Sequence, residues 1–171
     1  MKILILLITT ILGNFALLAQ REIVPTDSIK VFGKIKEAKT FSLAELDTFS
    51  KIAIPEQIIY NHKGEIKDTL KIMKGIPLKK LLSSIEFVYD KPKALNEFYF
   101  IFTATDNYKV VFSWNEIYNT DSGNNFFIIT EMGGKKLKDL DQRIYFVSAA
   151  DLKSGRRYIK GLEKIEVKQL E

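Results

Sequence analysis

The sequence has no cysteine and only one histidine among its 171 residues. The missing thiols exclude disulfide bonds, thiolate nucleophiles and the usual Cys/His zinc sites. His62 lies between Asn61 and Lys63 in a stretch with turn chemistry, which indicates an exposed turn residue rather than a metal ligand. A serine triad would have this histidine as its only possible base, and the sequence contains no G-x-S-x-G motif. The fold must therefore be stabilised by core packing.

Glycine-rich phosphate loops and large clusters of one charge are also missing. The pair Gly133-Gly134 stands alone, without the spacing of a dinucleotide-binding or P-loop motif. Asp139 and Asp141 form the closest acidic pair of a lysine-rich loop, where a solvated surface is expected. The chain has 26 Lys and Arg against 21 Asp and Glu, a formal net charge of +5, and the two signs are interleaved. This pattern argues against a nucleic-acid partner.

The N-terminal residues have the layout of a secretory signal peptide. Met1-Lys2 is a short basic start, an apolar run follows from Ile3, and small Ala19 precedes a polar stretch. We expect residues 1–19 to be removed, leaving an exported mature chain of residues 20–171 in the periplasm or outside the cell. The alternative is an uncleaved N-terminal anchor, although the apolar segment is shorter than the roughly 20 residues of a spanning helix. No transmembrane segment is expected after signal removal.

Residues 20–171 are long enough for a single domain and contain no repeat or linker. Several apolar or alternating runs predict strands, and turn residues at 61–64 predict a hairpin between the second and third of these runs. The expected strands are Ile29–Ile35, Ile52–Tyr60, Glu65–Met73, Phe98–Phe102, Tyr108–Phe112, Phe126–Thr130, Ile144–Val147 and Lys164–Lys168. Phe98–Phe102 is apolar at every position, which is typical of a central strand.

Only short helices are expected between these strands. Ser42 with Glu45, and Ser113 with Glu116, have the spacing of capping boxes at helix starts. Pro77 suits a first helical position, and the leucines that follow it repeat at helical spacing as a buried stripe. The sequence therefore predicts an α+β domain that is dominated by mixed sheet. A doubly wound parallel sheet would need longer helical crossovers.

The stretch from Asp151 to Val167 brings cations together. Gly155 can let successive backbone N–H groups point toward one anion, and Arg156 or Arg157 can offer a planar fork that suits phosphate. In an extended strand, however, Arg157 faces the side opposite to Arg156 and Lys160, so the three share a face only if the chain turns. The alternative is a basic surface loop at the start of a strand.

Four motifs in order resemble the molybdopterin-binding domain of the sulfite oxidase family. "GIPLKKLL" at Gly75–Leu82 resembles its "G-[VI]-P-L-x-x-L-L" segment, and "TDNY" at Thr105–Tyr108 resembles its "S-x-D-G-Y" turn. "QRIYFV" at Gln142–Val147 is similar to its "x-R-L-x-x-P" strand, and "GRRYIKGLEKIEV" at Gly155–Val167 is similar to its "G-A-R-W-V-K-x-[LV]-x-[RK]-I-E-V" ending. The resemblance extends over most of the chain from about Phe41.

This resemblance implies a mixed, sheet-rich α+β fold with a cleft able to hold a molybdopterin cofactor. Carried over position by position, it marks Arg143, Arg157 and Lys160 as cofactor-binding residues, with Lys160 nearest a cofactor phosphate. Asp106 and Tyr108 would be structural turn residues beside the cleft.

The chain departs from the family where the metal is bound. In the catalytic members a cysteine thiolate coordinates molybdenum, and this chain has no cysteine. We therefore expect a molybdopterin-binding-like domain that serves as a non-catalytic binding or accessory module, without catalytic or metal-ligating residues. Its expected partner is an anionic small molecule or a pterin phosphate. The alternatives are a molybdopterin-dependent oxidoreductase that uses no protein thiolate, and a protein-interaction module whose cleft is filled by side chains.

Overall fold

Two β-sheets and a separate hairpin make up most of the computed structural model, which describes residues 22–171. The signal peptide predicted over residues 1–19 lies outside the described residues. The first sheet has the strand order β2-β1-β13-β7-β8, with β1 and β13 parallel and the other neighbours antiparallel. Its strands are β1 (Ser28–Gly33), β2 (Lys39–Ser42), β7 (Phe98–Ala104), β8 (Lys109–Ser113) and β13 (Leu162–Gln169).

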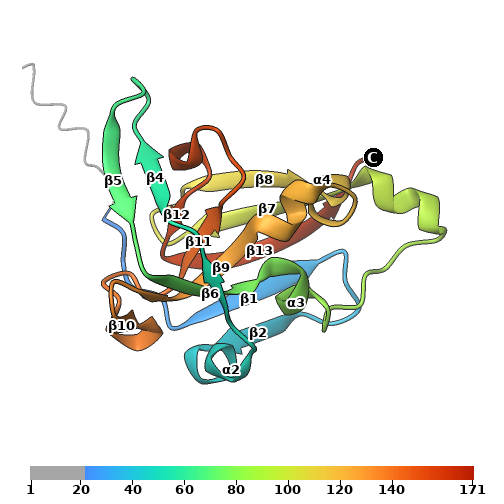
Figure 1. Cartoon of the computed structure of the whole chain (residues 1–171). Helices are drawn as coiled ribbons and strands as arrows, with labels where there is room; N and C mark the ends of the chain where they lie inside the picture. Colours follow the sequence, from blue (N-terminus) through green and yellow to red (C-terminus); the bar gives the residue numbers. More distant parts are fainter. Residues whose placement is uncertain (1–21) are drawn as a thin grey trace, which may run out of the picture.

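The second sheet has the order β12-β11-β9-β6-β3, with β10 beside β9, and its pairs are antiparallel. Its strands are β3 (Ile52–Ile54), β6 (Met73–Pro77), β9 (Phe126–Met132), β10 (Lys135–Lys136), β11 (Tyr145–Ser148) and β12 (Ile159–Lys160). The strands β4 (Gln57–Tyr60) and β5 (Ile66–Leu70) pair only with each other. Figure 1 shows this hairpin standing at the end of the molecule that lies away from the C-terminus.

The helices of the described chain are short. They are α2 (Leu43–Thr48), α3 (Leu78–Leu82), α4 (Trp114–Tyr118) and the 3₁₀ turns η1 (Pro92–Glu97), η2 (Asp121–Asn125), η3 (Leu137–Asp139) and η4 (Ser154–Arg156). None of the helices within residues 22–171 combines the length and the apolar character that crossing a membrane requires. One mixed sheet and one antiparallel sheet, with few short helices, confirm the predicted α+β class.

The second sheet is buried on both faces. Along β9, Phe126 and Ile128 belong to the main core, where the two sheets meet, while Phe127 and Ile129 belong to a smaller core on the side of the hairpin. Side chains of a strand alternate between faces, so a run of apolar residues fills both cores. Phe146 on β11 lies at the centre of the main core and contacts three other phenylalanine rings.

Local signals in the sequence positioned several elements correctly. The Ser42–Glu45 capping box forms, because the Ser42 Oγ accepts from the Glu45 N–H at 3.2 Å and the Glu45 carboxylate accepts from the Ser42 N–H at 2.8 Å. The predicted central strand, β7, pairs on both sides. Asn107, which stands at the glycine position of the "S-x-D-G-Y" pattern, has a φ of 68°, a left-handed backbone that asparagine adopts more readily than most residues.

Other expectations need correction. The runs 52–60 and 65–73 each break in two, because the chain leaves the second sheet at Pro55 and returns to it at Ile72, whose φ is 51°. Pro77 ends β6 and precedes the helix instead of beginning it. At the second predicted capping box, the Ser113 Oγ accepts from the Glu116 N–H at 3.1 Å, but the Glu116 carboxylate binds Arg157.

Candidate functional site

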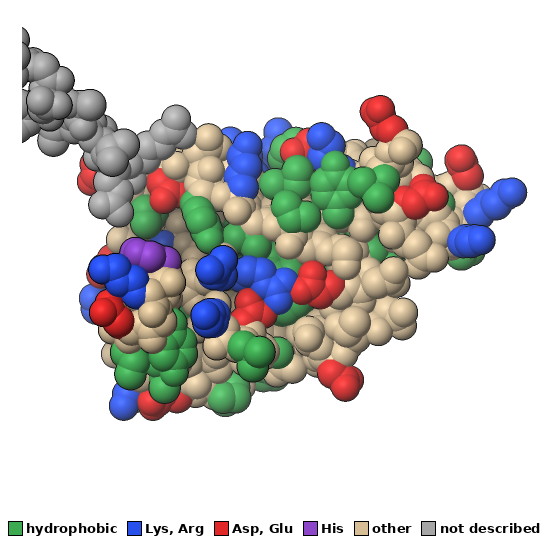
Figure 2. Space-filling view, turned by 90° about the horizontal axis from the view of Figure 1, so that it is seen from above, with side chains coloured by type: hydrophobic (Ala, Val, Ile, Leu, Met, Phe, Trp, Pro, Cys, Tyr) green, Lys and Arg blue, Asp and Glu red, His purple; other side chains and the backbone are tan. Residues whose placement is uncertain are grey.

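A cleft of about 740 Å³ lies between the β4–β5 hairpin and the β12 edge of the second sheet. One wall comes from the hairpin and includes Tyr60, His62 and Lys67, and the other includes Arg156 and Lys160. Figure 2 shows a hollow on this face beside the histidine side chain, with lysine and arginine side chains around it. The cleft is therefore open to solvent and has cations on both walls.

The charges of the cleft favour an anion. Lys67, Arg156 and Lys160 contribute three cations and Asp68 and Asp106 contribute two carboxylates, which leaves one excess positive charge when His62 is neutral. Both carboxylates already accept a local backbone hydrogen bond, Asp106 from the Tyr108 N–H at 2.9 Å and Asp68 from the Thr69 N–H at 2.8 Å. The positive excess suits a phosphate or carboxylate group.

Lys160 is the cation best placed to bind such a group. It lies half-buried on β12, opposite Tyr145 in the strand register. Its ammonium group is 5.7 Å from the centre of the Tyr158 ring. No carboxylate within residues 22–171 forms an ion pair with it, whereas most other partly buried cations of the protein are paired. The charge of Lys160 is therefore available to a ligand.

The turn between β7 and β8 supports the same wall. The left-handed Asn107 turns the chain so that Tyr108 reaches η4, where its hydroxyl donates to the Arg156 carbonyl oxygen at 2.6 Å. Asp106 and Tyr108 both line the cleft. The resemblance assigned these two residues a structural role beside the cleft, and their contacts are of that kind.

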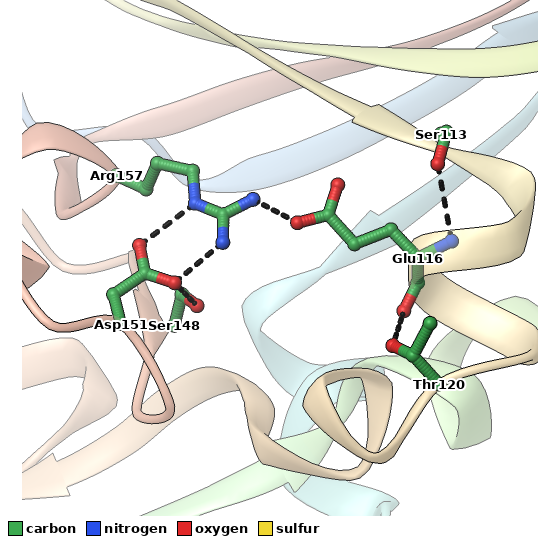
Figure 3. A network of polar contacts seen from close by, with 6 residues as sticks. All are labelled: Ser113, Glu116, Thr120, Ser148, Asp151 and Arg157. Atoms are coloured by element: carbon green, nitrogen blue, oxygen red, sulfur yellow. Dashed lines mark hydrogen bonds and ion pairs between the residues drawn. The ribbon is translucent and has the colours of Figure 1, made fainter.

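Arg157 is not among the residues that line the cleft, and its guanidinium lies in an ion-pair network with Asp151 and Glu116 (Figure 3). Its Nε donates to Asp151 Oδ2 at 2.7 Å, its Nη2 donates to Asp151 Oδ1, and its Nη1 donates to Glu116 Oε1. These bonds, above all those with Asp151, raise the pKa of Arg157 further above its already high ordinary value. Arg157 was predicted to bind a cofactor. Its three guanidinium nitrogen atoms already donate hydrogen bonds to carboxylates, and a ligand contact at Arg157 stays a prediction.

Arg143 also lies outside the lining of the cleft. It has a φ of 58° and forms an ion pair with Asp27, just before β1. Of the three predicted cofactor-binding residues, Lys160 alone lines the cleft, so the structure does not bring the three together there. Arg143 as a cofactor contact likewise stays a prediction.

Sequence reasoning missed the hairpin side of the cleft. His62 and Lys67 line it, although the sequence indicated only an exposed turn and a strand there. The turn itself was a clear signal, since the Asn61 side-chain oxygen accepts from the N–H groups of Lys63 and Glu65. The hairpin folds back over η4 because of long-range contacts, and no local pattern in the sequence reveals these contacts.

The residues present fit an anionic group better than the metal end of a molybdopterin cofactor. The chain offers no thiolate, which the catalytic members of the resembling family use for molybdenum. Within residues 22–171, no group of three or more His, Asp and Glu side chains is placed to hold a metal ion. The cations of the cleft could hold a phosphate, but the donor set does not match a molybdenum centre of this type.

Comparisons with known proteins support the fold. No protein family and no curated protein matches the sequence. Among solved structures, the sulfane dehydrogenase SoxCD from Paracoccus pantotrophus is similar with a TM-score of 0.56 and 11% sequence identity. The match covers 82% of this chain and 37% of the other, so this chain spans well under half of that protein. The similarity shows a distant relationship of fold.

Proposed function

We propose that this protein is an exported binding module whose cleft takes a small phosphate-bearing molecule, and that it is not itself a molybdenum enzyme. The observation that carries the proposal is Lys160, half-buried at the cleft and without a carboxylate partner in the described part of the chain. The cleft volume of about 740 Å³ falls within the roughly 300–1,000 Å³ that is typical of small-molecule sites. A pterin phosphate is the ligand that the resemblance to the sulfite oxidase family favours.

Four observations support the rest of the proposal. The N-terminal pattern of residues 1–19 favours export. The fold shared with a sulfane dehydrogenase is in keeping with the resemblance to the sulfite oxidase family. The absence of cysteine favours binding over molybdenum catalysis. An open cleft also weighs against an interaction module whose cleft is filled by its own side chains.

The anion site is tested by titrating the purified protein with inorganic pyrophosphate in a calorimeter. A charge-assisted hydrogen bond contributes about 1.5–3 kcal/mol, so Lys160→Ala should weaken binding by roughly tenfold or more. Lys168→Ala is the matched control, because Lys168 is an exposed lysine of β13 that does not line the cleft. Equal affinities for the two variants would refute the role of Lys160.

The non-catalytic role and export are tested on protein from its native host. We expect the exported form to begin at Gln20 and to contain no stoichiometric molybdenum. Stoichiometric molybdenum, or a redox activity with artificial electron acceptors that Lys160→Ala abolishes, would instead establish the oxidoreductase alternative.

A further inference from the structure

The segment from Asp151 to Lys160 supplies two cations to the cleft and one to the interior. Arg156 and Lys160 line the cleft, while Arg157, between them in the chain, does not line it and instead bonds Asp151 and Glu116 (Figure 3). The chain can do this because it turns at η4, where the Arg157 N–H donates to the Ser154 carbonyl at 3.1 Å. The orientation of the two cleft cations therefore depends on how firmly Arg157 is held.

Arg157 is held by both charge and packing. Its guanidinium carbon lies 4.7 Å from the centre of the Phe112 ring and 5.6 Å from that of Phe126. Its side chain is 24% exposed, and that of Asp151 is 12% exposed. These ring contacts and a two-point bond to Asp151 leave the guanidinium few alternative positions.

Its two carboxylate partners are themselves fixed by separate elements. The Ser148 hydroxyl at the end of β11 donates to Asp151 Oδ1 at 2.5 Å. Glu116 lies in α4, whose start is capped by Ser113 (Figure 3). Arg157 therefore joins the loop to the second sheet through Asp151 and to α4 through Glu116.

The same loop holds the opposite wall of the cleft. The Ser154 hydroxyl donates to the Ile58 carbonyl of β4 at 2.6 Å. A Cβ at Gly155 would lie 2.1 Å from the Tyr60 carbonyl oxygen, so η4 and the hairpin are in close backbone contact. Through this loop, Arg157 anchors both the wall that carries Lys160 and the hairpin wall.

The network also has a charge that disfavours an anion. One guanidinium faces two carboxylates, which leaves one excess negative charge at Arg157. A phosphate that approached Arg157 would have to displace a carboxylate from a partly buried pair, which is costly. The preferred place for an anion is therefore the cleft and not the network.

We propose that Arg157 is a positioning residue of the anion site. Held by Asp151 and Glu116, it orients Arg156 and Lys160 and sets the spacing between the two walls of the cleft, without contacting the ligand. This inference rests on the proposed function, because it concerns the same cleft.

The direction in which Glu116→Gln changes the pyrophosphate affinity distinguishes a positioning role of Arg157 from direct contact with the ligand. If Arg157 bound the ligand, removing a competing carboxylate would tighten pyrophosphate binding. Positioning requires weaker binding, by about threefold or more, because the amide holds the guanidinium less firmly. Arg157→Lys should weaken binding similarly, since lysine keeps the charge but loses the planar fork. Glu86→Gln is the control, as Glu86 forms an exposed ion pair with Lys36 away from the cleft.

Hydrogen exchange of the ligand-free protein gives a second readout. The Arg156 and Arg157 N–H groups, bonded to the carbonyls of Lys153 and Ser154, should exchange about tenfold faster in Glu116→Gln and in Arg157→Lys. Unchanged exchange, or tighter pyrophosphate binding by Glu116→Gln, would overturn the inference. Lys160→Ala could leave the pyrophosphate affinity unchanged while amide exchange still accelerates in Glu116→Gln and Arg157→Lys. In that case the proposed ligand site fails and the anchoring role of Arg157 stands.

Discussion

Replacing Gly155 by alanine tests how closely η4 packs against the hairpin. The added Cβ would lie 2.1 Å from the Tyr60 carbonyl oxygen, whereas real Cβ contacts essentially never fall below 3.0 Å. The two backbones must therefore separate by about 0.9 Å. A shift of that size along the contact would stretch the 2.6 Å bond from the Ser154 hydroxyl to the Ile58 carbonyl beyond hydrogen-bond range.

The expected cost combines a lost hydrogen bond with local overpacking. The bond contributes about 0.5–1.5 kcal/mol and overpacking costs about 1–3 kcal/mol, so we expect Gly155→Ala to lower the free energy of unfolding by about 1.5–4.5 kcal/mol. Pyrophosphate binding should weaken as well, because the hairpin wall moves. Chemical denaturation and calorimetry measure the two effects on the same protein.

Gly133→Ala is the matched control for this substitution. Gly133 has a φ of 58° and no atom within 4 Å of a built Cβ, so alanine there carries only the conformational cost, about 1 kcal/mol. It should leave pyrophosphate binding unchanged, as Gly133 does not line the cleft. If Gly155→Ala were no more destabilising than Gly133→Ala, the close contact between η4 and β4 would not exist in solution.

Three further outcomes follow from the core and the turns. Phe146→Ala should lower the free energy of unfolding by about 3–5 kcal/mol in urea, because the fully buried ring contacts three others; a loss below about 1 kcal/mol would contradict this packing. Asn107→Gly should be nearly neutral and Asn107→Val destabilising by about 1–2 kcal/mol, and equal stabilities would exclude the left-handed turn. Burial raises the pKa of Tyr118 and Tyr158 above 10, so on raising the pH the unfolded chain loses these protons before the folded protein does. The free energy of unfolding should therefore fall as the pH rises above about 10. Tyr158→Phe should make that fall less steep, and an unchanged pH profile would contradict the burial of Tyr158.

Local patterns were sufficient wherever a feature depends on neighbouring residues. The capping box at Ser42 follows from one serine and one glutamate three residues apart. The buried stripe of α3 follows from the spacing of its leucines, which are at most 1% exposed. The hairpin turn follows from Asn61, whose side chain bonds its own loop. For the capping box and the turn, the interaction that fixes the structure lies within a few residues of the signal, whereas the leucine spacing predicts which face of α3 is buried and not what covers it.

The site depends on contacts between distant parts of the chain, and there the sequence was less informative. Gly155 was interpreted as a glycine that frees backbone N–H groups for an anion, but the structure shows a different need, close approach to Tyr60. His62 and Lys67 reach the cleft only because the hairpin leaves the second sheet at Pro55 and folds back over η4. A sequence pattern gives the hairpin but not the direction in which it folds.

Arg157 and Lys160 show why a motif alone does not assign a ligand contact. Both belong to the same C-terminal motif, and the alternation of an extended strand predicts that they face opposite sides, although in the structure Arg157 caps η4 and only Lys160 lies in β12. Alternation cannot decide which side is the cleft. That choice depends on Glu116 and Phe112, more than 40 residues earlier in the chain, which together provide a carboxylate and a ring face on the inner side. Once Arg157 is paired there, the outer side is left to Lys160, and its cation has no partner among residues 22–171. Pairing of one basic residue and availability of the other are therefore two consequences of a single packing arrangement.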